Sequence, residues 1–496
     1  MNLSELLGQS VARWADKPAV IEGESVLTYA DLDRLVDEFA QRLQPLALAA
    51  GTRVGLHLPN SLNYIVWTYA LWRLHAVVVP IPVECPAEEI DTIARQMQLA
   101  FIISAEPLAQ SEPFGSVEHL VRLQPAIPAD NHGLNIAFIR FTSGTTSARK
   151  GVVLSHETVH ARVASANQTF RLGPEDVILW QLPMAHHFLI TIVLYLQSGS
   201  TIVLARHTMP RLFLAELNRW KCTVLYASPR YYGMLARDDS GLGMPSVRMA
   251  VSTTSALSED VAKDFLRRFD RPLIQALGVI ELGLVAANFQ HPLRHWRSIG
   301  QPAGQMQMRI VNPDADGCGE LAVAGPGIFD AYAAPWVPQS QVLNNGWFHT
   351  GDIARQDAEG RFYLLSRKTS VINRAGQKIF PEEVEGIINQ HPQVLESRVF
   401  GRPHARLGEV VEAEVVLAGA DAELEDIREY CRRQLAGHKI PAQLHVVKEL
   451  PKTAVTGKLR RETRPIILAT PFEAAKFVMG AGFLDACELI FSFTSG

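Results

Sequence analysis

Short apolar runs alternate with stretches of helical spacing over most of the chain, and this alternation limits the possible folds more than any other feature. The first apolar runs cover residues 54–58, 77–82 and 100–104, with helical spacing between them at 60–74 and 87–98. The pattern resumes after residue 170 and continues to about residue 277. Such alternation predicts a mainly parallel sheet covered by helices. Trp67 and Trp72 are expected in the core, because large aromatic residues chiefly supply buried area.

The pattern changes in the last third of the chain. From about residue 300, short strands are separated by Gly, Pro and Asn turns, which predicts a smaller β layer. A compact α+β segment follows, and the polar stretch Ser366–Thr369 before it is typical of a hinge. We expect an α/β fold: a large N-terminal domain over residues 1–367, with parallel-type sheets, covering helices and a small β layer, and a small C-terminal α+β domain over 368–463. We assign no function to the tail, residues 464–496.

Composition excludes several classes of partner. With 496 residues, of which 47% are hydrophobic, the chain can build two or three domains with cores. Its 47 basic and 51 acidic residues give a net charge of −4, which suggests no nucleic-acid or anionic-membrane partner. Five scattered cysteines outside any metal-binding spacing are typical of a reducing compartment. No signal peptide or membrane-spanning stretch is recognised, so we expect a cytoplasmic protein, monomeric or homodimeric.

A loop rich in hydroxylated residues follows the apolar run 136–141. It contains Thr142, Ser143, Gly144, Thr145, Thr146 and Lys150. Successive backbone N–H groups and hydroxyls form a nest that binds anions, and a lysine adds a point charge suited to phosphate. The loop is not a Walker A motif, because Arg149 stands where that motif has its second glycine. A Ser/Thr-rich surface turn is the alternative interpretation, and Ser155 is a candidate N-cap for the helix that follows.

Two further places in the sequence contain candidate functional residues. Glu281 comes soon after the apolar run 272–277, and open α/β sheets bind ligands just past the ends of such strands. An ordinary loop acid is the alternative. His186 and His187 are adjacent, but no third metal ligand is spaced near them. Core or surface histidines that bind nothing are the alternative there.

Several motifs occur in one order, and together they resemble the adenylate-forming superfamily of acyl-CoA synthetases, nonribosomal adenylation domains and firefly luciferase. The loop 142–151 resembles the family's Ser/Thr/Gly-rich loop ending in Pro-Lys-Gly, and Leu277–Glu281 falls where the family has Tyr-Gly-x-Thr-Glu. Further matches are Gly319–Leu321, Gly325–Pro326, Thr350–Asp352, Arg367, Gly376, Pro381–Glu385, Lys439–Pro441, Leu450–Thr453 and Gly457–Lys458. The resemblance covers about residues 10–462.

This resemblance implies a reaction in two steps. A carboxylate attacks the α-phosphorus of ATP to give an acyl-adenylate and pyrophosphate, and the acyl group then passes to a thiol. The resemblance assigns catalytic roles to Lys458, Glu281 and Thr142, with Glu281 as the Mg²⁺ ligand. The nucleotide and thiol would be bound by Thr142, Ser143, Gly144, Thr145, Thr146, Lys150, Thr254, Gly278, Glu281, Asp352, Arg367, Gly376 and Lys458.

The thiol acceptor is implied to be coenzyme A, and the phosphopantetheine arm of an acyl carrier protein is the alternative. Rotation about Lys368 and Thr369 would withdraw Lys458 and bring in the loop at Gly376 to line a thiol tunnel. Both thiols would use that tunnel, so the sequence leaves the two acceptors open.

The resemblance also implies which residues surround the small-molecule carboxylic acid. They are His186, His187, Phe188, Tyr226, Ser228 and Thr253. An amino acid is disfavoured, because the segment Pro183–Phe188 lacks the aspartate that anchors an α-amine in relatives. Thr253 and Thr254 stand where relatives often have two glycines, which favours a small or medium acid, aliphatic or aryl.

Some positions depart from the family pattern. Ile280 replaces a threonine whose hydroxyl touches phosphate, and an apolar side chain cannot make that hydrogen bond, worth about 0.5–3 kcal/mol. Thr369 replaces the usual hinge Asp or Lys. The segment between Thr453 and Gly457 is one residue longer than usual. A catalytically degenerate binder of nucleotide or acyl groups is therefore a third hypothesis.

Overall fold

The computed structural model describes residues 1–114, 118–124, 130–141, 150–419, 423–452 and 459. By its internal contacts the chain divides into Met1–Arg460 and Arg461–Gly496. The second of these parts, and with it the predicted tail, lies outside the described residues.

A large mixed sheet combines the N-terminal strands with residues 177–302. Its strand order is β16-β15-β14-β13-β12-β10-β11-β1-β2, with parallel pairing from β14 to β1 and antiparallel strands at both ends. The strands are β1 (Pro18–Glu22), β2 (Ser25–Thr28), β10 (Val177–Trp180), β11 (Thr201–Leu204), β12 (Val224–Ala227), β13 (Met249–Ser252), β14 (Ile274–Val279), β15 (Gly283–Ala287) and β16 (Gln301–Pro302). This sheet confirms the parallel α/β arrangement predicted from the alternation.

A second mixed sheet has the order β20-β19-β9-β8-β4-β3-β5-β7-β6. Its strands are β3 (Arg53–His57), β4 (Val77–Pro80), β5 (Phe101–Ser104), β6 (Glu112–Phe114), β7 (Glu118–Arg122), β8 (Ile136–Phe141), β9 (Gly151–Ser155), β19 (Ala331–Ala333) and β20 (Trp336–Pro338). The segment 105–134 looks irregular in the sequence, yet β6 and β7 pair there as antiparallel strands, with β6 at the edge of the sheet. A short edge strand tolerates Pro113, and this hides it from sequence patterns.

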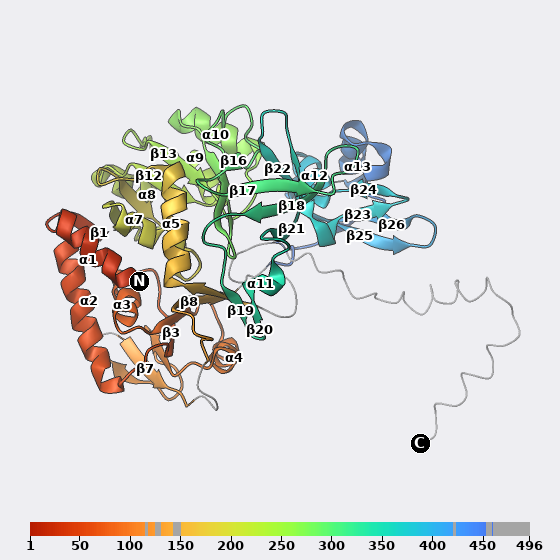
Figure 1. The fold of residues 1–496 in the computed structure, drawn as a ribbon. Helices are drawn as coiled ribbons and strands as arrows, with labels where there is room; N and C mark the ends of the chain where they lie inside the picture. The colour runs from red at the N-terminus through yellow and green to blue at the C-terminus, as the bar shows by residue number, and fades with distance from the viewer. Residues whose placement is uncertain (115–117, 125–129, 142–149, 420–422, 453–458, 460–496) are drawn as a thin grey trace, which may run out of the picture. The chain divides into compact units, whose positions relative to one another are not determined.

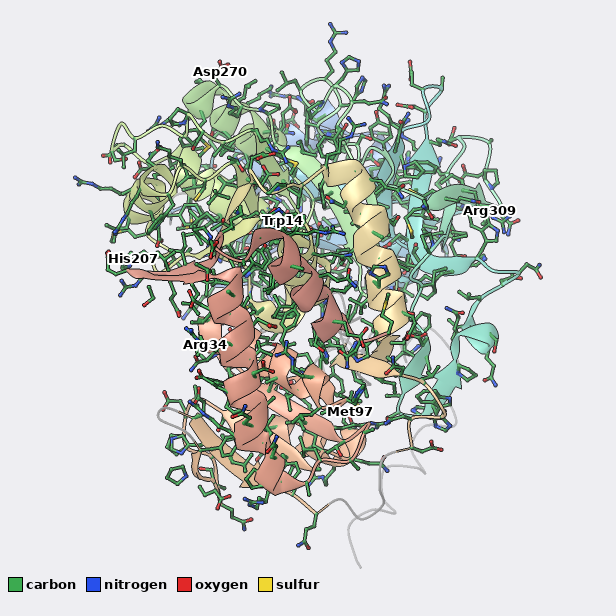
Figure 2. The ribbon with its side chains drawn as sticks, turned by 60° about the vertical axis from the view of Figure 1, so that its left-hand side comes forward. Trp14, Arg34, Met97, His207, Asp270 and Arg309 are labelled. Carbon is green, nitrogen blue, oxygen red and sulfur yellow. The ribbon has the colours of Figure 1, made fainter. Side chains whose placement is uncertain are left out.

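Helices connect and cover these sheets (Figure 1). They are α1 (Leu3–Trp14), α2 (Tyr29–Leu43), α3 (Leu62–Arg73), α4 (Ala87–Met97), α5 (His156–Phe170), α6 (Met184–His187), α7 (Ile192–Gln197), α8 (Pro210–Arg219), α9 (Pro229–Ala236), α10 (Glu259–Phe269) and α11 (Gln339–Val342), with short 3-10 turns at Gln44–Leu46, Phe188–Ile190, Lys368–Ser370 and Gly437–Lys439. Helices α1 and α2, which carry the labelled Trp14 and Arg34, lie side by side (Figure 2). None of the described helices is long and apolar enough to cross a membrane.

Helix α5 packs between the two mixed sheets and links their cores. It contacts β15 of the first sheet and β8 and β9 of the second. Ser155 caps its N-terminus, as predicted, by accepting a hydrogen bond from the Thr158 N–H at 3.1 Å. The predicted core aromatics Trp67 and Trp72 are both fully buried in the cluster that spans the sheets.

Two smaller sheets follow in the sequence. One has the order β17-β18-β21-β22, with β17 (Gln307–Val311), β18 (Gly319–Ala324), β21 (Phe348–Gln356) and β22 (Phe362–Arg367). The other consists of β23 (Ile372–Arg374), β24 (Gln377–Ile379), β25 (Val394–His404), β26 (Gly408–Leu417) and β27 (Gln443–Val446). Its cluster of buried residues includes side chains from α12 (Pro381–Ile388) and α13 (Leu424–Gln434). These sheets confirm the predicted small β layer and the α+β segment.

Candidate active site

Several predicted site residues meet at the carboxyl edge of the first sheet. The register pairs Tyr226 of β12 with Val251 of β13, and Ser252 of β13 with Gln275 of β14. Tyr226, Ser228, Thr253, Thr254, Gly278 and Glu281 therefore all lie at or just past the ends of adjacent strands. Open α/β sheets bind their ligands at this edge.

Glu281 lies in the turn between β14 and β15, and its side chain is largely buried. Its Oε1 accepts a hydrogen bond from the Tyr332 hydroxyl at 3.0 Å. Burial raises the pKa of that hydroxyl, and the neighbouring Glu281 charge raises it further. The Lys150 ammonium lies 4.7 Å from the centroid of the same tyrosine ring. Tyr332 thus brings the predicted metal ligand and the predicted phosphate-binding lysine into one site, and no sequence motif pointed to it.

Arg162 holds the turn that carries Glu281. This buried side chain of α5 donates hydrogen bonds to the backbone carbonyls of Ile280 at 2.9 Å, Glu281 and Gly327. Burial lowers the pKa of its guanidinium to about 9, although the charges of Asp330 and Glu281 act in the opposite direction. No sequence signal indicates this role, because Arg162 looks like any arginine on a helix. Its contacts link the site to the central helix.

Replacing Arg162 with methionine is expected to lower the free energy of unfolding by about 2–4 kcal/mol, because a buried carbonyl left without its donor costs about 1–3 kcal/mol. Chemical denaturation followed by tryptophan fluorescence measures this. Arg267→Met is the matched control: it lies on the surface of α10 with 77% of its side chain exposed, so a change below about 0.5 kcal/mol is expected. Equal stability of the two variants would contradict the role of Arg162.

Asp352 and Arg367 form a cross-strand pair on β21 and β22. The Arg367 Nε lies 3.0 Å from the Asp352 Oδ1, and its Nη1 donates to the Thr350 carbonyl at 3.1 Å. The Asp352 side chain is 12% exposed, whereas that of Arg367 is 60% exposed. The structure brings these two predicted nucleotide-binding residues together. A held carboxylate of this kind can accept hydrogen bonds from two adjacent hydroxyls.

Residues predicted to surround the acid lie in different surroundings. The Trp180 ring stacks on Tyr226 with 6.1 Å between ring centroids, and it contacts His187 edge-on with a centroid distance of 6.3 Å. Two of the predicted pocket residues, Tyr226 and His187, therefore contact the same ring. Burial raises the pKa of the Tyr226 hydroxyl, and the Thr253 side chain beside it acts in the opposite direction. Phe188 instead lies in the aromatic core, 5.5 Å from Tyr64 and 6.0 Å from Trp72. The Ser228 hydroxyl caps α9 by accepting from the Tyr231 N–H.

Backbone conformation distinguishes two of the other predicted residues. Thr254 has a φ of +78°, a region that strongly favours glycine over a β-branched residue. Gly376 has a φ of +84° and forms the tip of the β23–β24 hairpin with Ala375, whose φ is +52°. Two positive φ values in a two-residue loop are typical of a type I′ turn. The geometry of the turn therefore accounts for the glycine at this position.

Several predicted residues lie outside the described residues. They are Thr142, Ser143, Gly144, Thr145, Thr146 and Lys458. His186 lies beside His187 on α6, shortly after the strand β10, and Gly278 lies exposed where the β14–β15 register shifts.

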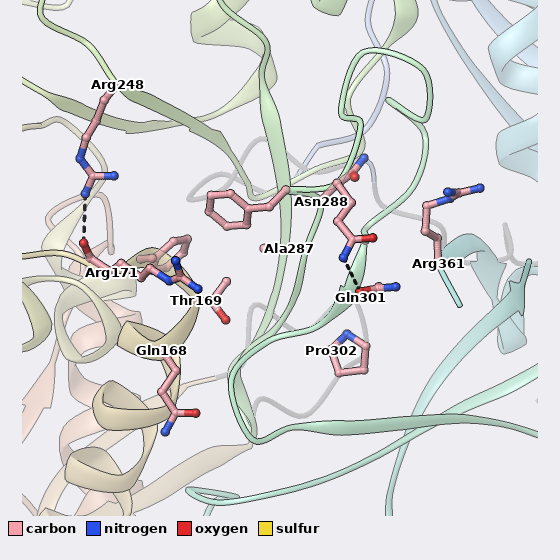
Figure 3. Close-up of a pocket in the computed structure, with 13 residues that line it drawn as sticks. Gln168, Thr169, Arg171, Arg248, Ala287, Asn288, Gln301, Pro302 and Arg361 are labelled. Carbon is pink, nitrogen blue, oxygen red and sulfur yellow. Dashed lines mark hydrogen bonds between the residues drawn. The ribbon is translucent and has the colours of Figure 1, made fainter. Parts of the chain in front are cut away.

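A separate cavity of about 440 Å³ lies at the opposite edge of the first sheet (Figure 3). Arg248 of its lining directly precedes β13, and Ala287 ends the antiparallel strand β15, so the cavity lies near the amino ends of the parallel strands. Within it Gln290 donates to Gln301 at 3.0 Å. None of the predicted site residues lines this cavity.

Comparison with known proteins identifies the family. Residues 7–333 match the family model described as AMP-binding enzyme, and residues 383–458 match the model for the C-terminal domain of that enzyme. The chain therefore belongs to the AMP-binding enzyme family. This finding confirms the resemblance to adenylate-forming enzymes.

Named relatives match over nearly the whole chain. A long-chain-fatty-acid–CoA ligase of Escherichia coli O157:H7 is 28% identical over 93% of this chain and 94% of its own length. A sulfoacetate–CoA ligase of Cupriavidus necator is 28% identical over 92% of this chain and 96% of its own. An oxalate–CoA ligase of Arabidopsis thaliana is 25% identical over 92% and 97%.

Solved structures share the fold. ATP-bound MatB from Rhodopseudomonas palustris superposes with a TM-score of 0.80 at 22% identity, covering 93% of this chain and 97% of its own. The o-succinylbenzoate CoA synthetase MenE from Bacillus subtilis, solved with its acyl-adenylate, gives a TM-score of 0.80 at 22% identity, covering 92% and 98%. Family and relatives together make this protein an AMP-forming acid–thiol ligase, which activates a carboxylic acid with ATP for transfer to coenzyme A.

Proposed function

We propose that the acid is adenylated at the carboxyl edge of the first sheet, in the space bounded by Glu281, Tyr332 and Lys150. The observation that carries this proposal is the contact of Tyr332 with both other residues. Lys150 would neutralise phosphate charge beside the loop 142–149. Preorganised charges of this kind supply most of the catalysis in phosphoryl chemistry, because positioning and charge stabilisation dominate there.

Glu281 fits the role of a Mg²⁺ ligand. Mg²⁺ takes hard oxygen ligands and is commonly held by one or two carboxylates together with substrate phosphates. Tyr332 donates to only one of the two Glu281 carboxylate oxygens in the described contacts, and Arg162 fixes the backbone at this position. Mg²⁺ would neutralise phosphate charge as pyrophosphate leaves. Thr142 would assist in the loop, and Lys458 would reach the α-phosphate and the acid carboxylate.

The nucleoside would be held by Asp352, whose carboxylate would accept hydrogen bonds from both ribose hydroxyls. The ion pair with Arg367 supports this role, since it fixes the carboxylate in one orientation. Thr254 and Gly278 would lie against the nucleotide from the ends of β13 and β14.

The acid is proposed to be small or medium in size. Its pocket would be lined by His186, His187, Tyr226 and Thr253, with Phe188 and Ser228 supporting the pocket from the core and from the α9 cap. Thr253 is 5% exposed and lies beside Tyr226, which leaves less room than two glycines would. The named relatives span acids from oxalate to long-chain fatty acids, so relatedness alone does not fix the size.

Acyl transfer would follow a rotation of residues 368–463 against residues 1–367. The turn Lys368–Ser370 supports a hinge here, because it separates β22 from the sheet that carries Gly376. That glycine would then line the tunnel for the coenzyme A thiol. We place the enzyme in the cytoplasm as a monomer or homodimer, in keeping with its scattered cysteines.

Release of pyrophosphate from ATP and Mg²⁺ with a panel of carboxylic acids tests the proposal. Acid-dependent release that rises on adding coenzyme A, with an acyl-CoA product, is expected. Release that responds to a phosphopantetheinylated carrier protein but not to coenzyme A would instead assign the carrier as acceptor. ATP binding without release for any acid would contradict the proposal and favour a degenerate binder.

A further inference from the structure

Arg140 projects from the same face of the second sheet as Tyr332. It lies on β8 opposite Val152 of β9, and Val152 also lies opposite Tyr332 of β19. Residues directly opposite each other in a sheet share a face. Arg140 and Tyr332 are therefore two strands and roughly 10 Å apart at the usual strand spacing. Tyr332, Val152 and Arg140 thus form a row across three strands. Lys150 contacts Tyr332 at one end of this row, and Arg140 lies at the other end.

The Arg140 guanidinium has no hydrogen-bond or ion-pair partner in the described part of the chain. Its Nε is buried and unbonded. The Arg140 side chain as a whole is only partly buried. Three arginines that are fully buried all have partners: Arg53 bonds to Asn131 and two carbonyls, Arg162 to three carbonyls, and Arg398 pairs with Glu414 at 2.7 Å. Burial lowers the pKa of Arg140 to about 10, although the Glu281 charge acts in the opposite direction. Leaving a buried nitrogen of a charged group without a partner costs free energy, and an anion bound to the guanidinium would remove that cost.

Tyr64 supplies a second unsatisfied donor on the same side. Phe138 lies two residues before Arg140 on β8, so both side chains share a face. Phe138 stacks on Phe188 at 6.5 Å, and Phe188 lies 5.5 Å from Tyr64. The Tyr64 hydroxyl is fully buried and has no hydrogen-bond partner in the described structure. A guanidinium and a hydroxyl together suit an oxyanion such as a carboxylate or sulfonate.

We propose that Arg140, together with the Tyr64 hydroxyl, binds a second anionic group on the acid, so that the enzyme activates dicarboxylic acids or acids with a sulfonate. This inference rests on the proposed adenylation site. The carboxylate that reacts with ATP would lie near Tyr332, beside the phosphates. The second anionic group, at the far end of the acid, would bind Arg140. A phosphate of ATP is the alternative ligand of Arg140, and the experiment below distinguishes it from an anionic group on the acid.

The test compares acids of equal chain length, succinic with butanoic acid and adipic with hexanoic acid, in the pyrophosphate-release assay. Wild-type protein is expected to show a kcat/KM at least ~10-fold higher for one or both diacids, because a charge-assisted hydrogen bond to the second anionic group is absent for the monoacids. Arg140→Gln is expected to lose about 10- to 100-fold for the diacids and less than about 3-fold for the monoacids, with the KM for ATP unchanged. Arg140→Lys should restore part of the diacid activity, and Tyr64→Phe should lower it by a few fold.

Three results would overturn this inference alone. An equal loss of kcat/KM for all acids, at an unchanged thermal midpoint, would assign Arg140 to the reaction itself. A raised KM for ATP in Arg140→Gln would assign it to a phosphate. Wild-type release with monoacids alone would exclude a second anionic group while leaving the adenylation site standing. Absence of release with every acid would instead overturn the adenylation proposal and this inference together. Tyr64→Phe keeps the test decisive if Arg140→Gln does not fold.

Discussion

Replacing Glu281 with glutamine is expected to lower the kcat for acid-dependent pyrophosphate release by about 10²–10³-fold, the usual effect of removing one preorganised electrostatic group from an active site. Glutamine keeps the shape and can still accept the Tyr332 hydrogen bond, but it removes the negative charge proposed to hold Mg²⁺. The apparent affinity for Mg²⁺ should fall in the same variant. Steady-state kinetics over a Mg²⁺ series measure both effects.

Glu118→Gln is the matched control for this change. Glu118 is also a buried glutamate, 3% exposed, and it accepts a hydrogen bond from Asn63. It lies on β7, which four strands separate from β9, the strand next to Lys150. Its activity should stay within about twofold of wild type, as for most substitutions away from a site. If Glu281→Gln behaved like Glu118→Gln, Mg²⁺ would have to be bound elsewhere.

Replacing Asp352 with alanine is expected to raise the KM for ATP by about 10- to 100-fold and to change kcat little. The carboxylate is proposed to accept two ribose hydrogen bonds, and hydrogen bonds to a charged group contribute about 1.5–3 kcal/mol. The loss should be similar for every acid, because the ribose contact is independent of the acyl group. Initial rates over an ATP series at saturating acid measure it.

Asp357→Ala serves as the control for Asp352→Ala. Asp357 directly follows β21 and, like Asp352, pairs with an arginine, since its Oδ2 lies 2.8 Å from the Arg361 Nε. The variant loses an ion pair of the same kind without touching the proposed nucleotide site. An equal rise in the KM for ATP in both variants would show that the sheet, rather than the ribose contact, is responsible.

The fold was predictable because its strands and helices have different hydrophobic periods. The parallel strands of both large sheets are buried on two faces and therefore stand out as apolar runs, as at Val77–Pro80. The strands β6 and β7 near the edge of the second sheet were not predicted, since each is short and the first contains Pro113. Long-range pairing supplies their stability, and single-sequence patterns do not report it.

The site was predictable only where a motif carries the chemistry. Glu281 and Asp352 could be named because each follows a recognisable run of residues. Tyr332, Arg162 and Arg140 could not, because their roles depend on which strands become neighbours: β9 brings Tyr332 and Arg140 onto one face although they lie far apart in the sequence. Arg162 contacts backbone carbonyls, Tyr332 contacts the Glu281 carboxylate and the Lys150 ammonium, and Arg140 has only a proposed ligand. None of these leaves a sequence pattern.

The most direct test of the central claim is to trap the acyl-adenylate. The protein is mixed with ATP, Mg²⁺ and an active acid without thiol, quenched, and examined by mass spectrometry, and a second sample is chased with coenzyme A before quenching. The account predicts an enzyme-bound acyl-adenylate that converts to acyl-CoA and AMP in the chase and that is nearly lost in Glu281→Gln. Formation of acyl-CoA without any adenylate, or an adenylate formed equally well by Glu281→Gln, would contradict it.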